Sequence, residues 1–181
     1  MRKLLMPFLF LFTVLAAKAQ QSPTGAALPA PEEFVNAIYP TVVDSTFKQF
    51  YLVMGTDSCR FLKYDYDEWI KYHLKEPLSF NILNELSEKV YLSRYPYFWK
   101  QQKLQKAVCI TRKQADSILD RNKLPVFSFS LPQFTDDGQY AVIDLNLLCG
   151  PVCGRGLTCI YRLTTKGEWK LVGTNVNYST F

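Results

Sequence analysis

Apolar residues in the first half of the chain recur mostly at helical spacing. The start Pro31-Glu32-Glu33 predicts the beginning of a helix, because proline needs no backbone donor there and acids suit the positive end of the helix dipole. Pro40 is expected to end that helix. The four residues Phe50–Val53 fit both a helical stripe and a short buried strand, and the pattern leaves both interpretations open.

Three further segments carry helix signals. Residues 67–74 have an amphipathic pattern, with Pro77 as the expected stop. Ser79 is a predicted N-cap for the apolar stripe that follows it. Thr111 and Gln114 have the spacing of a capping box at the start of another helix. The first half of the chain is therefore predicted to be mainly helical.

Beyond Pro125 the apolar residues no longer recur at helical spacing but at every second position. Such alternation is typical of a strand with one face in the core. Turn residues at 136–138 and at 166–167 separate the alternating runs. Asp144 and Asn146 fall on the side expected to face water. The predicted strands cover residues 126–131, 140–148, 157–163 and 169–176.

This order of elements predicts an α+β fold, with N-terminal helices packed on the apolar face of a C-terminal antiparallel sheet of about four strands. Short turns can join only antiparallel neighbours, which is why the strands are expected to form a meander. A chain of 181 residues with one change of period is expected to form one domain, residues 32–181.

The first nineteen residues have the pattern of a secretory signal. Arg2 and Lys3 precede an apolar run, and Ala17-Lys18-Ala19 resembles a signal peptidase site. Residues 20–31 are predicted to be a flexible leader. Gln20 stands where a lipoprotein would carry cysteine, and no later run is long enough to span a bilayer, so no stable membrane anchor is expected. The predicted location is the periplasm or the exterior of the cell.

Composition and charge narrow the possible functions. The chain is 48% hydrophobic and 20% charged, as folded proteins are. Removing the signal takes away Arg2, Lys3 and Lys18 but no acid, so the formal net charge falls from +5 to +2. So small a charge argues against nucleic acid as a partner.

Three cysteines lie close together between two predicted strands, in the sequence Cys149-Gly-Pro-Val-Cys153-Gly-Arg-Gly-Leu-Thr-Cys159. In an oxidising compartment such cysteines are expected to form a structural disulfide. Cys149 can pair with Cys153 at the tip or with Cys159 across the strands, and the sequence leaves both open. Cys59 and Cys109 are secondary disulfide candidates.

The run from Tyr140 to Trp169 resembles uncharacterised exported proteins of Bacteroidota. In these proteins a C-G-x-x-C-G-x-G segment joins two strands ahead of a closing G-x-W-K strand. The resemblance implies export, a hairpin and a pairing of Cys149 with Cys153. It implies no activity.

Each catalytic interpretation lacks a residue, a spacing or a position that its mechanism requires. A thiol-disulfide catalyst needs C-x-x-C at a helix start, whereas Cys149 and Cys153 have three residues between them and lie between strands. A cysteine hydrolase, or a zinc site completed by the three hairpin cysteines, needs His73, the one histidine of the chain. The acids Asp65, Asp67 and Glu68 fit the start of a helix. We therefore predict no catalytic residue, no metal and no cofactor.

Aromatic residues offer a ligand-binding interpretation that needs no missing group. Tyr66, Trp69 and Tyr72 could line a groove for a peptide or a carbohydrate, although a hydrophobic core needs the same residues. The sequence predicts a non-catalytic binding or interaction domain whose partner is a protein, peptide or carbohydrate. The alternative is an extracytoplasmic enzyme that uses Cys149 and Cys153 or His73.

Overall fold

The computed structural model of the chain describes residues 27–43, 48–61, 66–93, 96–119, 125–150 and 153–180. The predicted signal and the leader up to residue 26 lie outside the described residues. The helical segments are α1 (Pro31–Val42), α2 (Tyr66–Glu68), a π-helical turn that continues it (Trp69–His73), α3 (Phe80–Leu92), a 3-10 turn (Gln101–Lys103) and α4 (Arg112–Leu119). The strands are β1 (Phe50–Val53), β2 (Ala107–Ile110), β3 (Val126–Phe129), β4 (Gln133–Phe134), β5 (Tyr140–Gly150), β6 (Cys153–Leu163) and β7 (Trp169–Thr180).

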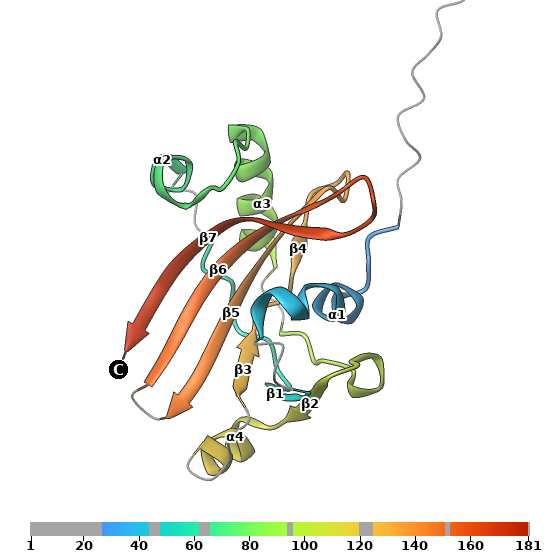
Figure 1. Ribbon diagram of the computed structural model, residues 1–181, viewed down its shortest axis with the longest axis vertical. Coiled ribbons are helices and arrows are strands. Elements are labelled where there is room, and N and C mark those ends of the chain that lie inside the picture. The colour runs from blue at the N-terminus through green and yellow to red at the C-terminus, as the bar shows by residue number, and fades with distance from the viewer. Residues whose placement is uncertain are drawn as a thin grey trace, which may run out of the picture.

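Within the described residues the strands form one seven-stranded sheet in the order β2-β1-β3-β5-β6-β7, with β4 paired to β5 beside this path (Figure 1). The predicted α+β class is confirmed. The expectation of about four antiparallel strands is wrong, because β1 runs parallel to both β2 and β3. The chain can make these parallel pairs because it crosses over through α2 and α3 between β1 and β2, and through α4 between β2 and β3. For the same reason the helices do not all precede the sheet.

The sheet carries helices on both faces, whereas the sequence predicted one covered face. On one side α1 packs on alternate residues of the central strands, including Phe127, Phe129 and Ile143. The opposite side, here called the second face, carries two separate clusters. The segment of α2 and α3 covers Val142 near one end of β5, and α4 covers Val126 and its neighbours near the other end. Figure 1 shows these two groups of helices at opposite ends of the sheet.

Local signals in the sequence predicted several element boundaries. The Ser79 hydroxyl accepts a hydrogen bond of 3.4 Å from the Ile82 N–H and caps α3, as expected. The capping box of α4 is also confirmed, with the Thr111 N–H donating to Gln114 at 2.8 Å and the Gln114 N–H donating to Thr111 at 3.2 Å. Both predicted turns are present, and Gly138 adopts a φ of +66° that other residues rarely take.

Two helix predictions need correction. Pro40 does not end α1, which continues to Val42. Pro40 lies in the last turn, where it removes one backbone hydrogen bond, and the Val43 N–H closes the helix on the Tyr39 carbonyl at 3.1 Å. The helix predicted for residues 67–74 changes to a π-helical turn at Trp69 and stops before Leu74. Leu74 is extended because it forms a bridge with Gly173 of β7.

Candidate functional site

The middle of the second face, between the two groups of helices, is polar. Asp144 and Asn146 of β5 lie there between the apolar Val142 and Leu148. The prediction that they face water is wrong, because Asp144 is 1% exposed and Asn146 is 6% exposed. Residues 56–60, which we call the crossing segment, hydrogen-bond to these strands and contribute to their cover.

The crossing segment is fixed to the sheet through Asp57. Its backbone N–H donates to the Phe129 carbonyl at 3.0 Å, beside a parallel bridge to Ser130. Its carboxylate accepts hydrogen bonds from the Ser128 hydroxyl at 2.5 Å and from the Asn146 amide at 3.2 Å. A solvent-exposed acid therefore holds two buried polar side chains of neighbouring strands.

Asp144 fixes the same segment at its other end. Its carboxylate accepts from the Arg60 backbone N–H at 2.7 Å and from the Thr158 hydroxyl at 2.5 Å. The Cys59 thiol lies 3.5 Å from the same carboxylate. Burial raises the pKa of Asp144, and these donors, which favour the ionised form, oppose the rise without cancelling it. The carboxyl is thus a buried acid whose ionised form is disfavoured relative to water.

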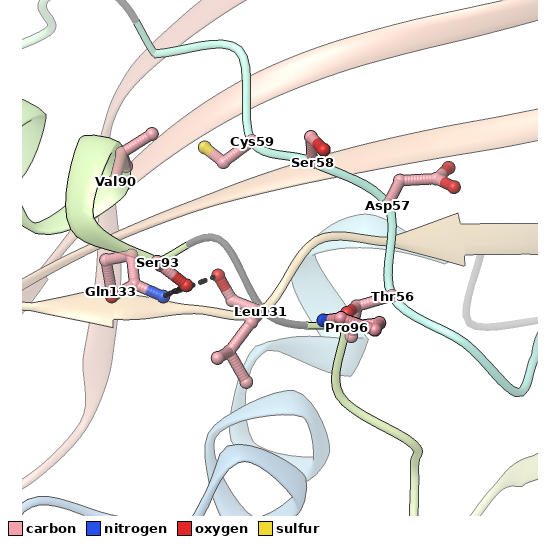
Figure 2. Close-up of a pocket in the computed structure, with 9 residues that line it drawn as sticks. All are labelled: Thr56, Asp57, Ser58, Cys59, Val90, Ser93, Pro96, Leu131 and Gln133. Atoms are coloured by element: carbon pink, nitrogen blue, oxygen red, sulfur yellow. Dashed lines mark hydrogen bonds between the residues drawn. The ribbon is translucent and has the colours of Figure 1, made fainter.

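A pocket of about 120 Å³ opens between the crossing segment, the end of α3 and β4 (Figure 2). Gln133 crosses its wall, donating to the Ser93 hydroxyl at 3.0 Å and to the Leu131 carbonyl at 3.3 Å. The wall of the pocket therefore combines hydroxyl and amide groups with a few apolar side chains. The lining residues are Thr56, Asp57, Ser58, Cys59, Val90, Ser93, Pro96, Leu131 and Gln133.

The three free thiols of the described chain are poor nucleophiles. Burial, followed by the nearby Asp144 charge, raises the pKa of Cys59 far above its ordinary value. Burial likewise raises the pKa of Cys159 to about 12 and raises the pKa of Cys109. A thiol attacks only as the thiolate, which is scarce at neutral pH under these conditions. Cys59, although it lines the pocket, is therefore no activated catalytic cysteine.

The structure does not bring together two of the candidate cysteine pairs. Cys159 is a free, buried thiol opposite Ile143 in the ladder of β5 and β6. Six residues of β5 separate Ile143 from Cys149, which amounts to about 20 Å along the strand and is too far for a bond. Cys59 and Cys109 are also free thiols. They lie in different parts of the fold, since Cys59 belongs to the crossing segment and Cys109 to β2, where it pairs with Leu52.

The pairing of Cys149 with Cys153 stays a prediction, and the backbone register of the hairpin is compatible with it. Cys153 is opposite Gly150, and Cys149 occupies a break in register between Leu148 and Gly150. The two backbones are therefore close.

We expect the protein, prepared without reductant, to be lighter by two hydrogens than its reduced form and to yield a peptide linking Cys149 to Cys153. Alkylation after unfolding should then label Cys59, Cys109 and Cys159. The Cys149→Ser variant should lose the mass difference. Five thiols that alkylate without reductant would contradict the disulfide.

His73 lies far from the hairpin cysteines. Its carbonyl is near Gly173 of β7, which pairs with Ile160 of β6. Seven residues separate Ile160 from Cys153, a distance of about 23 Å along the strand. The imidazole instead contacts the Trp69 ring, and its Nε2 lies 3.6 Å from Glu68. The zinc set and the hydrolase that would combine His73 with these cysteines are therefore not assembled.

The predicted aromatic groove does not form from its three residues. Tyr66 and Trp69 are 5% and 2% exposed and belong to the core under α2 and α3, whereas Tyr72 is 66% exposed. The rings of Tyr66 and Trp69 are therefore part of the hydrophobic core and cannot line a groove. In the part of the chain that the structure describes, no cluster of three His, Cys, Asp or Glu residues could hold a metal ion.

Sequence reasoning missed the crossing segment and its anchors. Ser128 in β3 and Ser130 just after it are polar residues at alternate positions, like Asp144 and Asn146 in β5, and Ser128 pairs directly with Asn146. The signal was therefore present as two matching polar pairs. It could be recognised only by knowing that β3 and β5 are neighbours.

Compared with known proteins, the chain matches no family model, no curated protein and no solved structure. The site therefore has to be interpreted from its own geometry. No helix among the described residues is both long and apolar enough to cross a bilayer.

Proposed function

We propose that this protein is an exported, non-catalytic binding domain and that its ligand occupies the pocket beside the crossing segment. The observation that carries the proposal is the anchoring of that segment by Asp57 at one end and Asp144 at the other. Because these bonds are made within the chain itself, they fix the pocket wall, and ligand binding loses little free energy to ordering it.

The lining favours a small, neutral, polar group as the part of the ligand that enters. The hydroxyls of Ser58 and Ser93 can donate or accept hydrogen bonds without adding charge. The amide oxygen of Gln133 can accept one, since its nitrogen already donates to Ser93 and Leu131. A volume of about 120 Å³ is smaller than the pockets that enclose whole drug-sized molecules. One side chain of a peptide or one hydroxymethyl group of a sugar suits this size, with the rest of the ligand outside.

The alternative function is thiol-disulfide exchange at Cys149 and Cys153. The register that brings their backbones together favours it. Such a catalyst would turn over a disulfide substrate, and the Cys149→Ser variant would abolish turnover while leaving the fold intact. Reduction of insulin disulfides by the protein with dithiothreitol distinguishes the two functions, since the binding domain should show no rate above the reductant alone.

The pocket is tested by filling it. The Ser58→Trp variant adds an indole ring to the exposed wall of the pocket, at a side chain whose loss breaks no hydrogen bond that anchors the crossing segment. We expect it to weaken binding of a pocket ligand at least tenfold with unchanged thermal stability. The probes are free amino acids, dipeptides and small saccharides, detected by ligand-observed NMR. Ser117→Trp, on the exposed side of α4, is the matched control and should bind as the unmodified protein does.

Two results would contradict the proposal. One is the absence of binding by every probe class to the folded protein. The other is binding that Ser58→Trp and Ser117→Trp leave equally strong, which would place the ligand elsewhere.

A further inference from the structure

A second pocket, of about 150 Å³, lies between the later turns of α1, the start of β1 and the residues that precede β2. We call it the α1 pocket. It shares no lining residue with the pocket beside the crossing segment. Its described lining residues are Val35, Asn36, Tyr39, Pro40, Phe50, Gln105 and Lys106.

One wall of the α1 pocket is aromatic. The rings of Tyr39 and Phe50 stack with their centroids 5.1 Å apart and their planes 15° apart. Both side chains are buried and belong to the core cluster beneath α1, so the core bounds the pocket on this side. An apolar cavity of this volume is large enough for a benzene-sized group. The interior therefore favours an apolar group of about four to six carbons.

The polar rim of the α1 pocket is fixed by hydrogen bonds within the chain. The Asn36 amide donates to the Lys103 carbonyl at 2.8 Å and accepts from the Gln105 N–H at 3.0 Å. The Phe50 N–H donates to the Lys106 carbonyl at 3.1 Å. This loop is thus tied to both α1 and β1. The backbone that carries Lys106 is therefore held beside the pocket.

Lys106 brings a positive charge to the α1 pocket. Its Nζ lies 4.9 Å from the centre of the Tyr39 ring, a cation–π contact that keeps the ammonium near this wall. No salt bridge joins it to a described carboxylate. The acids of α1 occupy its first turn, whereas the pocket borders its later turns. From residue 96 to residue 115 the sequence has five basic residues and no acid, so the side chains around the rim favour an anion.

We propose that the α1 pocket binds a small carboxylate ligand. Its aliphatic part lies against Tyr39 and Phe50, and its carboxylate pairs with the Lys106 ammonium. The apolar interior selects the carbon chain, and the lysine selects the charge. This ligand class differs from the neutral polar group proposed for the pocket beside the crossing segment, and each pocket can be tested without the other.

Three probes with one carbon skeleton test the ligand class. Isocaproate is the probe, and isohexanol and isohexylammonium are its neutral and cationic matches at equal ionic strength and neutral pH. In amide-detected NMR of the full chain, isocaproate should cause saturable shifts at Asn36, Tyr39, Phe50, Gln105 and Lys106. Isohexanol should bind about three- to fivefold more weakly, as the loss of one exposed ion pair implies, and isohexylammonium should bind more weakly still.

Variants locate the charge and the cavity. Lys106→Gln removes the ammonium but keeps the carbonyl that accepts from Phe50, and it should weaken isocaproate binding about three- to fivefold while leaving isohexanol binding unchanged. Lys113→Gln, at an exposed lysine of α4, is the matched control and should bind as the unmodified protein does. Gln105→Trp, at an exposed residue of the rim, adds an indole ring to the pocket and should weaken both probes.

Equal affinity for isocaproate and isohexanol would overturn the proposal. It would leave Lys106 as a cation near the C-terminal part of α1, where the helix dipole alone favours one. The absence of a saturable shift with isocaproate, or an affinity that Lys106→Gln and Gln105→Trp leave unchanged, would also overturn it. Ser58→Trp should leave isocaproate binding intact, which separates this proposal from the pocket beside the crossing segment.

Discussion

Asp144→Ala is expected to lower the free energy of unfolding by about 4 kcal/mol, a large part of the stability of a small domain. The substitution removes the acceptor for the Arg60 N–H and the Thr158 hydroxyl, and Thr158 is buried. Each donor that is left buried without a partner costs about 1 to 3 kcal/mol. Urea unfolding followed by tryptophan fluorescence measures the loss.

A surface carboxylate provides the control. Asp116→Ala, on the exposed side of α4, should change the unfolding free energy by no more than about 0.5 kcal/mol. An equally mild effect of Asp144→Ala would show that the buried hydrogen bonds do not hold the crossing segment, and it would contradict the proposed site.

The same residue predicts a dependence on pH. Burial raises the pKa of Asp144 above its ordinary value of 3.8, so the folded state holds this proton more tightly than the unfolded state does. The stability from that proton is present below the ordinary value and is lost as pH rises through the folded value. Relative to Asp144→Asn, which has no such proton, the unmodified protein should therefore gain stability as pH falls from neutral toward 4. A difference that is constant or of opposite sign would contradict the raised pKa.

Trp69→Ala is expected to cost about 4 kcal/mol, because it removes the largest side chain of the cluster beneath α2 and α3. The indole packs edge-to-face on Phe61, with ring centroids 5.4 Å apart, and it also approaches Gly173 of β7. A cavity of that size in a fully buried place cannot collapse completely. Thermal and urea unfolding give the value.

Tyr72→Ala separates a core role from a binding role. Tyr72 follows Trp69 by three residues, is 66% exposed and should tolerate the change within about 0.5 kcal/mol. If Trp69→Ala proved as mild as Tyr72→Ala, the ring would not serve as core, and the aromatic groove predicted from sequence would regain its support.

Local signals made part of the fold predictable. The caps of α3 and α4 depend on side chains within three residues, and the turns depend on glycines at 138 and 167, so neighbouring residues are enough to identify them. The long strands β5 and β6 show many repeats of the alternating period. The strands β1 and β2 have four residues each, too few for a period to show, and their parallel pairing depends on a crossover that no local pattern encodes.

The candidate site was harder to predict for a related reason. The alternation of apolar and polar residues in β5 correctly assigns side chains to its two faces. It does not predict which segments of the chain cover each face. Asp144 and Asn146 looked solvent-facing, although a segment more than eighty residues earlier in the chain hydrogen-bonds to both. Asp57 itself lies outside any periodic pattern. Only the long-range return of the chain makes these residues a site.

Amide chemical-shift mapping of the protein with the peptide and saccharide probes tests most directly whether the ligand occupies the pocket. We expect the probe that binds to shift the amides of residues 56–59, together with those of Val90, Ser93 and Gln133. Ser58→Trp should require at least tenfold more probe to produce these shifts. Shifts confined to other surfaces, such as the exposed Phe98 or the tip of the β5–β6 hairpin, would contradict the assignment of the pocket as the ligand site.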